Sequence, residues 1–184
     1  MQFTTTLLAS IFAASATALP QSTPIPADGK FGIITIRSGS AIQNSGVQAA
    51  HNSLFVGLPK QNASCDSETN YATFYLLDEE LRLYAASATP QTIFVDRSGM
   101  GQGKIGYVTG AQGLGRNWET KGWALNNNQL EFDGTGIQAC PGSIDGAWSL
   151  WLQGSATPGY NQNCTGVIAA AIEAKEPIGC LYTQ

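Results

Sequence analysis

Residues suited to catalysis are scarce in this 184-residue chain. His51 is the single histidine, and the polar run around it, from Gln48 to Ser53, predicts an exposed turn. One histidine excludes metal sites built on a histidine pair and any catalytic triad that cannot use His51 itself. Ten of the acidic residues could supply a carboxylate pair for glycoside hydrolysis, but most stand at expected turns or outward strand positions, where a solvated surface role is the simpler interpretation. They are Asp78, Glu79, Glu80, Asp96, Glu119, Glu131, Asp133, Asp145, Glu173 and Glu176.

A glycine-rich run from Gly101 to Gly106 fits the GxGxxG pattern of dinucleotide-binding loops. That chemistry needs a helix N-terminus after the loop to hold a pyrophosphate, whereas the residues Tyr107 to Thr109 are typical of a strand. We therefore expect a hairpin loop here. The sequence also has no GxSxG, HExxH or EF-hand motif. It predicts no enzyme, no catalytic residue, no metal site and no cofactor.

Four cysteines are present, Cys65, Cys140, Cys164 and Cys180, and no two of them have CxxC spacing. An even number with such spacing is typical of structural disulfides in an oxidising compartment, and not of a metal or redox site. Four cysteines allow three connectivities. We favour Cys140 with Cys164 and Cys65 with Cys180, because closing the short loop leaves one long tie between the middle and the end of the chain.

Two N-glycosylation sequons stand beside cysteines in polar stretches, at Asn62-Ala63-Ser64 and at Asn163-Cys164-Thr165. We expect Asn163 to be the weaker acceptor, since a disulfide at the middle residue of its sequon can block the modification.

The aromatic residues could stack on sugar rings in a lectin-like groove, although aromatic residues of small β proteins usually belong to the core. The residues considered are Trp118, Trp123, Trp148, Trp151, Tyr71, Tyr75, Tyr107 and Tyr160. Trp148 and Trp151 differ by three positions and should face opposite sides of one strand, so we expect one to be buried and the other exposed. These two are the candidate glycan contacts.

Composition limits the partners. Only 12% of the residues are charged, about half the usual ~25%, and the formal net charge is -4 without any cluster of Lys or Arg. This gives no electrostatic footprint for nucleic acid or for an anionic membrane.

The chain divides into three segments. Residues 1–18 read as a secretory signal peptide, with an apolar run and a cleavage site of the A-x-A type at Ala16-Thr17-Ala18. Residues 19–30 form a Pro-rich leader that we expect to be flexible. Residues 31–184 then form a single domain. No later apolar run approaches the ~20 residues of a membrane span.

Short β-type runs separated by turn signals fill this domain and predict an all-β fold. The runs are Phe31 to Arg37, Ser53 to Gly57, Ala72 to Leu77, Leu81 to Ala85, Thr92 to Val95, Lys104 to Thr109, Gly122 to Leu125, Gln129 to Phe132, Ile137 to Cys140 and Ala147 to Leu152. Asp78 to Glu80 and Asn126 to Asn128 are expected hairpin turns. The alanine-rich segment 167–175 fits either a helix or a closing strand.

The pattern also suggests an internal repeat. The hairpins at 74–84 and 122–132 are each followed by two more short runs, and the amino-terminal stretch can be laid over both with strands at 33–36, 41–43, 46–49 and 54–56. Three such units would make a β-trefoil of about twelve short strands, which we favour. A two-sheet β-sandwich or jelly roll is the alternative.

Several features, in this order along essentially the whole chain after the signal, resemble the PhiA family of fungal cell-wall proteins. They are the signal itself, the run Ile34 to Ser40 with Ile42 following, the hairpin Gly122 to Phe132, Ala139-Cys140-Pro141, and the late Cys164 and Cys180. The distal half is also similar to the C-terminal cysteine domain of PIR-type wall mannoproteins. It lacks the upstream glutamine-containing repeats by which those proteins are ester-linked to glucan.

The resemblance implies a secreted, wall-associated protein without catalytic residues that serves in phialide and conidium formation and in general stress protection. Its partners would be cell-wall polysaccharide or mannoprotein. The alternative hypothesis is a lectin-like module that binds wall polysaccharide through exposed aromatic residues.

Overall fold

The structure is a computed structural model that describes residues 23–85, 89–110 and 112–184. It confirms the all-β class, with fifteen strands and two short 3₁₀ helices in these residues. The strands are β1 (Phe31–Ile36), β2 (Ser45–Ala50), β3 (Ser53–Val56), β4 (Ser64–Cys65), β5 (Phe74–Leu77), β6 (Glu80–Leu83), β7 (Gln91–Asp96), β8 (Lys104–Thr109), β9 (Trp118–Glu119), β10 (Trp123–Asn126), β11 (Gln129–Phe132), β12 (Ile137–Cys140), β13 (Trp148–Leu152), β14 (Thr165–Glu173) and β15 (Cys180–Leu181). The 3₁₀ helices are η1 (Ile144–Gly146) and η2 (Pro158–Tyr160).

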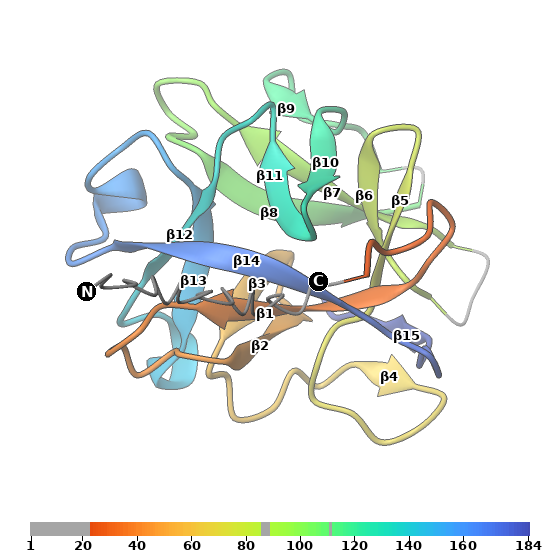
Figure 1. The fold of residues 1–184 in the computed structure, drawn as a ribbon. Helices are drawn as coiled ribbons and strands as arrows, with labels where there is room; N and C mark the ends of the chain where they lie inside the picture. The colour runs from red at the N-terminus through yellow and green to blue at the C-terminus, as the bar shows by residue number, and fades with distance from the viewer. Residues whose placement is uncertain (1–22, 86–88, 111) are drawn as a thin grey trace, which may run out of the picture.

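Thirteen of the strands form one antiparallel sheet that closes on itself, while β4 and β15 pair separately. β14 pairs with β1 along its length, from Phe31 opposite Glu173 to Ile36 opposite Ile168, and Figure 1 shows the two strands side by side. Pairings continue from β14 through β12, β13, β3 and β2 back to β1. Closure removes free sheet edges from these six strands. The trefoil and its sandwich alternative stay predictions.

Three hairpins, β2–β3, β5–β6 and β10–β11, share the same two-residue turn with positive φ at both positions. Such turns match the right-handed twist of the flanking strands, and Asn and Asp enter this conformation more readily than most residues. The turn residues are His51, Asn52, Asp78, Glu79, Asn127 and Asn128. The predicted hairpins at 78–80 and 126–128 are thus confirmed, and His51 is exposed in a turn, as expected.

Three other local expectations can be compared with the structure. The glycine-rich run at 101–106 ends the turn between β7 and β8 and enters strand β8 at Lys104, so no helix follows it. The ambiguous segment 167–175 belongs largely to strand β14. The strand expected at 41–43 is wrong: these residues lie in turns, where the buried Ile42 offers its carbonyl to the Thr35 hydroxyl at 2.6 Å.

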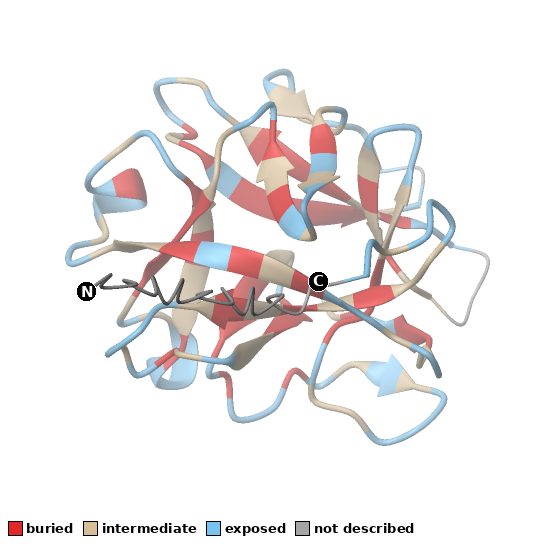
Figure 2. Ribbon diagram, viewed as in Figure 1, coloured by how far each residue is buried: buried red, intermediate tan, exposed pale blue. Residues whose placement is uncertain are grey.

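The core lies inside the closed sheet. β1 alternates buried and half-buried residues, and Figure 2 shows buried positions alternating with more exposed ones along β14. This period of two sends every second side chain inward. The largest buried side chain, Trp123, meets Phe132 edge to face with ring centroids 5.1 Å apart. Burial of this apolar surface is the main stabilising contribution.

Part of the expected leader is held against the domain. The Asn128 side chain accepts a hydrogen bond from Ile25 N at 3.2 Å and donates one to Thr23 O at 2.9 Å, and Ile25 packs on the core. The described residues from Thr23 onward are thus anchored at the β10–β11 turn. The predicted signal peptide, residues 1–18, lies outside the described residues.

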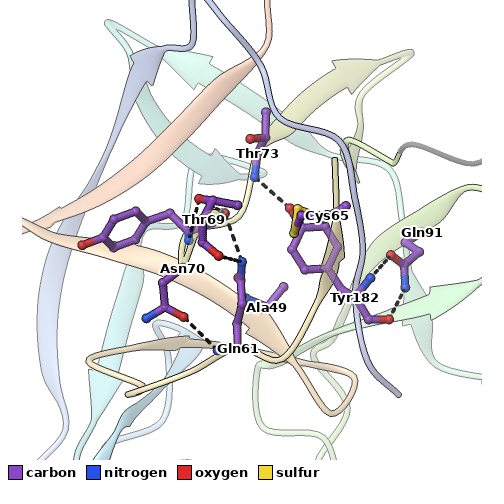
Figure 3. Close-up of a disulfide and its surroundings, with 10 residues drawn as sticks. Ala49, Gln61, Cys65, Thr69, Asn70, Thr73, Gln91 and Tyr182 are labelled. Carbon is purple, nitrogen blue, oxygen red and sulfur yellow. Dashed lines mark hydrogen bonds between the residues drawn. A yellow bond between two sulfur atoms is a disulfide. The ribbon is translucent and has the colours of Figure 1, made fainter. Parts of the chain in front are cut away.

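The C-terminal segment is bonded into the domain (Figure 3). Tyr182 N donates to Gln91 Oε1, Gln91 Nε2 donates to Tyr182 O, both at 2.9 Å, and Thr73 N donates to the Tyr182 hydroxyl at 3.1 Å. The Tyr107 hydroxyl donates to the carbonyl of Thr183. Tyr182 is 2% exposed, so these bonds tie the last residues of the chain to β7 and to the segment before β5.

We expect stability to fall in alkali because of these tyrosines. Burial raises the pKa of Tyr182 to about 12 and raises that of Tyr107 as well. The folded state therefore holds phenolic protons that the unfolded chain releases near pH 10, so the stabilisation is complete below about pH 10 and is lost as the pH rises toward 12. Denaturant unfolding at several pH values, with phenolate absorbance recorded in parallel, measures this. Constant stability from pH 9 to 12 would contradict it.

Candidate functional site

All four cysteines are paired in the structure, Cys65 with Cys180 and Cys140 with Cys164. These are the two pairs favoured among the three connectivities. Cys65 and Cys180 stand directly opposite each other in the β4–β15 ladder, and the adjacent pairing of Ala139 with Thr165 brings Cys140 next to Cys164. Each bond ties a late segment of the chain to an earlier one.

The acidic residues with the clearest interactions are bound to arginines. Glu80 accepts from Arg82 Nη2 at 2.6 Å and from the Thr120 hydroxyl at 2.9 Å. Partial burial alone would raise the pKa of Glu80, but these hydrogen bonds outweigh it and lower that pKa. Arg97 binds Glu119 and lies 3.0 Å from Asp133 Oδ2. Arg97 Nη2 binds both Glu119 and Asp133, so these two carboxylates lie near each other around one arginine, whereas Glu80 binds Arg82 within β6.

Within the described ranges, no group of three or more His, Cys, Asp or Glu side chains is placed to hold a metal ion. The same ranges contain no helix long and apolar enough to cross a membrane.

The two candidate glycan contacts are both half-buried, so the expectation of one buried and one exposed indole is wrong. Trp148 lies on the inward side of β13 and packs against the core. Trp151 lies on the outward side, where its Nε1 donates to the Ser149 hydroxyl at 2.9 Å and Gly159 of η2 packs on its ring. The two side chains do point to opposite sides, but η2 covers part of the outward one.

Both sequon asparagines, Asn62 and Asn163, are exposed, with φ of 54° and 57°. Neither side chain is hindered by burial. The two sites differ because Cys164, the middle residue of the second sequon, is bonded to Cys140.

We therefore expect the Asn62→Gln variant to lose most of the N-glycan, and Asn163→Gln to lose little. Electrophoretic mobility before and after enzymatic deglycosylation, with mapping of glycopeptides, measures this. The thermal midpoint of Asn62→Gln should stay nearly unchanged, because substitutions at exposed positions usually alter stability by less than about 0.5 kcal/mol. Full occupancy of Asn163 would show that the disulfide does not impede modification.

Three of the surface hollows contain tyrosine or side-chain amide groups. The first has a volume of about 440 Å³, and its lining includes Lys30, Tyr75, Arg82 and Tyr84. The second, of about 380 Å³, includes Arg97, Gln102 and Gln153. The third, of about 290 Å³, includes Tyr71 and has no charged residue in its lining.

The sequence alone did not distinguish Tyr71 from the other aromatic residues. What distinguishes it is a contact with Gly46, 25 positions earlier, which no local pattern reveals.

Comparison with known proteins gives consistent matches over the whole domain. A family model described as "PhiA-like secreted protein" matches residues 31–183. A protein of Aspergillus fumigatus named "Cell wall protein phiA" is 52% identical, with 100% of both chains covered. A protein of the same name from Aspergillus niger is 51% identical, and the match covers 95% of this chain and 96% of that protein. Another of the same name, from Emericella nidulans, is 48% identical over 100% of both chains. No solved structure gives a significant match.

Proposed function

Because the chain belongs to the PhiA-like family of secreted proteins, we propose that it is a non-enzymatic protein of the fungal cell wall that serves in phialide and conidium development and in general stress protection. The observation that carries the proposal is the likeness along the full chain to proteins named as cell-wall proteins. The likeness to PIR-type mannoproteins stays a prediction.

The structure supports a protective role in physical terms. A closed sheet has few edges for unwanted pairing, and two disulfides restrict unfolding. Carboxylates whose charge is neutralised by Arg82 and Arg97 suit a structural protein better than a hydrolase, whose two carboxyl groups must flank one bond of a substrate. Such a domain would persist in an extracellular matrix.

Deletion of the gene tests the proposal. We expect malformed phialides, fewer conidia and lower survival under heat and oxidative stress, all restored by the wild-type gene. Normal phialides, normal spore numbers and normal stress survival in the deletion strain would overturn it.

The second candidate function is a lectin-like module, favoured by the half-exposed indole of Trp151 on the outward side of β13. Its test is retention of the purified protein on insoluble wall polysaccharides. Passage of the protein through all of them without retention would reject it.

A further inference from the structure

The hollow beside Tyr71 has no charged residue in its lining and presents an exposed tyrosine beside neutral polar groups. Tyr71 is 58% exposed, yet its ring packs directly on β2: an alanine Cβ at Gly46 would lie 2.3 Å from Tyr71 Cδ1. The ring therefore contacts the strand at Gly46 and is otherwise open to solvent. The residues of the hollow used below are Asn44, Ser45, Gly46, Gln48, Asn70 and Tyr71.

Side-chain amides hold the loop that carries Tyr71, and Figure 3 labels Gln61, Thr69 and Asn70 in it. Gln61, 2% exposed, donates from Nε2 to the carbonyls of Tyr71 at 3.3 Å and Thr69 at 3.4 Å, and its backbone N donates to Asn70 Oδ1 at 2.9 Å. Asn70 Nδ2 donates in turn to the carbonyl of Pro59 at 3.1 Å. The loop is held before any ligand arrives, which lowers the entropy cost of binding.

The polar groups of the hollow divide into two sets. Gln48 is satisfied by Leu58, to whose carbonyl it donates and from whose N it accepts. By contrast, Asn44 Nδ2, the Ser45 hydroxyl and the Tyr71 hydroxyl have no hydrogen-bond partner among the described residues. The second set is available to a ligand.

We propose that this hollow binds a neutral polysaccharide of the wall, with one sugar ring on Tyr71 and its hydroxyls bonded to Asn44 and Ser45. The proposal rests on the proposed wall function and names a contact for it. A sugar ring has an apolar C–H face that suits the negative face of an aromatic ring, and a rim of hydroxyls that both donate and accept. A charged ligand would find no opposite charge in this lining, in contrast to the hollows that contain Arg82 and Arg97.

The hollow is too small to enclose a whole oligosaccharide. At about 290 Å³ it is just below the ~300–1,000 Å³ of sites that enclose a small molecule. An open hollow of this size can contact one or two units of a long chain and leave the rest in solvent.

Retention of the purified secreted protein on insoluble β-glucan and on chitin tests the proposal. We expect Tyr71→Ala to bind the retaining glycan about tenfold more weakly, because it removes the aromatic platform. Tyr71→Phe separates the ring from its hydroxyl and should bind more tightly than Tyr71→Ala. The matched control is Tyr160→Ala, since Tyr160 is 92% exposed and lies outside this hollow; it should bind like the wild type.

A pair of glycine variants tests the position of the ring without removing it. Gly46→Ala places a methyl group where the Tyr71 ring lies and should weaken binding as Tyr71→Ala does. Gly32→Ala on the neighbouring strand β1 meets nothing within 4 Å and should leave binding unchanged. Thermal midpoints of all variants confirm that each is folded.

Three results would overturn the site. They are unchanged binding of Tyr71→Ala and Gly46→Ala, loss of binding in Trp151→Ala but not in Tyr71→Ala, and lack of retention of the wild type on both glycans. The first two results would show that the protein binds the glycan through another part of its surface. The third rejects a glycan site altogether, whereas failure of the proposed function would appear in the deletion strain, whatever the binding result.

Discussion

Replacing Cys65 and Cys180 together by alanine is expected to lower the free energy of unfolding by about 4–5 kcal/mol. The bond joins residues 115 positions apart, and on the chain-entropy account a loop of ~100 residues contributes ~4.7 kcal/mol. A domain of this size has only ~5–15 kcal/mol of stability in total. The double variant should therefore unfold at a much lower temperature and be cut rapidly by protease.

The control is the double alanine variant of Cys140 and Cys164, whose loop spans only 24 positions. It should lose about 3 kcal/mol, measurably less than the long loop. Urea unfolding of the wild type and both variants compares the three free energies. An equal or larger loss for the shorter loop would contradict the account, and a peptide joining Cys65 to Cys140 in non-reducing mapping would refute the pairing itself.

Tyr182→Ala should be nearly as damaging, with a loss of about 3–5 kcal/mol. The substitution leaves a cavity where a 2% exposed aromatic ring stood, and it removes the hydroxyl that accepts from Thr73 N at 3.1 Å. The backbone of Tyr182 also pairs with the side-chain amide of Gln91, and this tail follows directly on the disulfide at Cys180. Hydrogen exchange should show β15 and the neighbouring end of β7 opening first.

Tyr182→Phe separates the two contributions. It keeps the ring and leaves the buried Thr73 N–H without its acceptor, so we expect a loss of about 1–2 kcal/mol. The midpoint of urea unfolding measures both variants. A loss from Tyr182→Ala that does not exceed the loss from Tyr182→Phe would show that the ring contributes nothing and that the tail is held by other bonds.

Local sequence signals predicted the hairpins because their cause is local. Two consecutive residues such as Asn127 and Asn128, between alternating flanks, favour a tight turn whatever surrounds them. The alanine-rich segment that became β14 could not be assigned in this way, since alanine suits a helix. There, six pairings with β1, from Phe31 to Ile36, override the local preference.

The candidate glycan site is formed by contacts between distant residues, which the spacing of residues in the sequence does not reveal. Period-two alternation correctly predicted that Trp148 and Trp151 point to opposite sides of the strand. It could not predict that η2 covers part of Trp151. In the same way, nothing near Tyr71 in the sequence indicates that it packs on Gly46, or that Gln61 is buried beneath it. Burial patterns within one strand can be predicted, whereas packing between distant segments requires the fold.

Stepwise extraction of isolated cell walls tests the central claim, a secreted protein held in the wall, most directly. We predict that detergent leaves the protein in the wall. Reductant should not release it either, because all four cysteines are bonded within the chain and none is left to form a disulfide with a partner. Glucanase should release it with the polysaccharide. Recovery of the protein in the culture medium or in the detergent extract, with none left in the wall, would contradict the account.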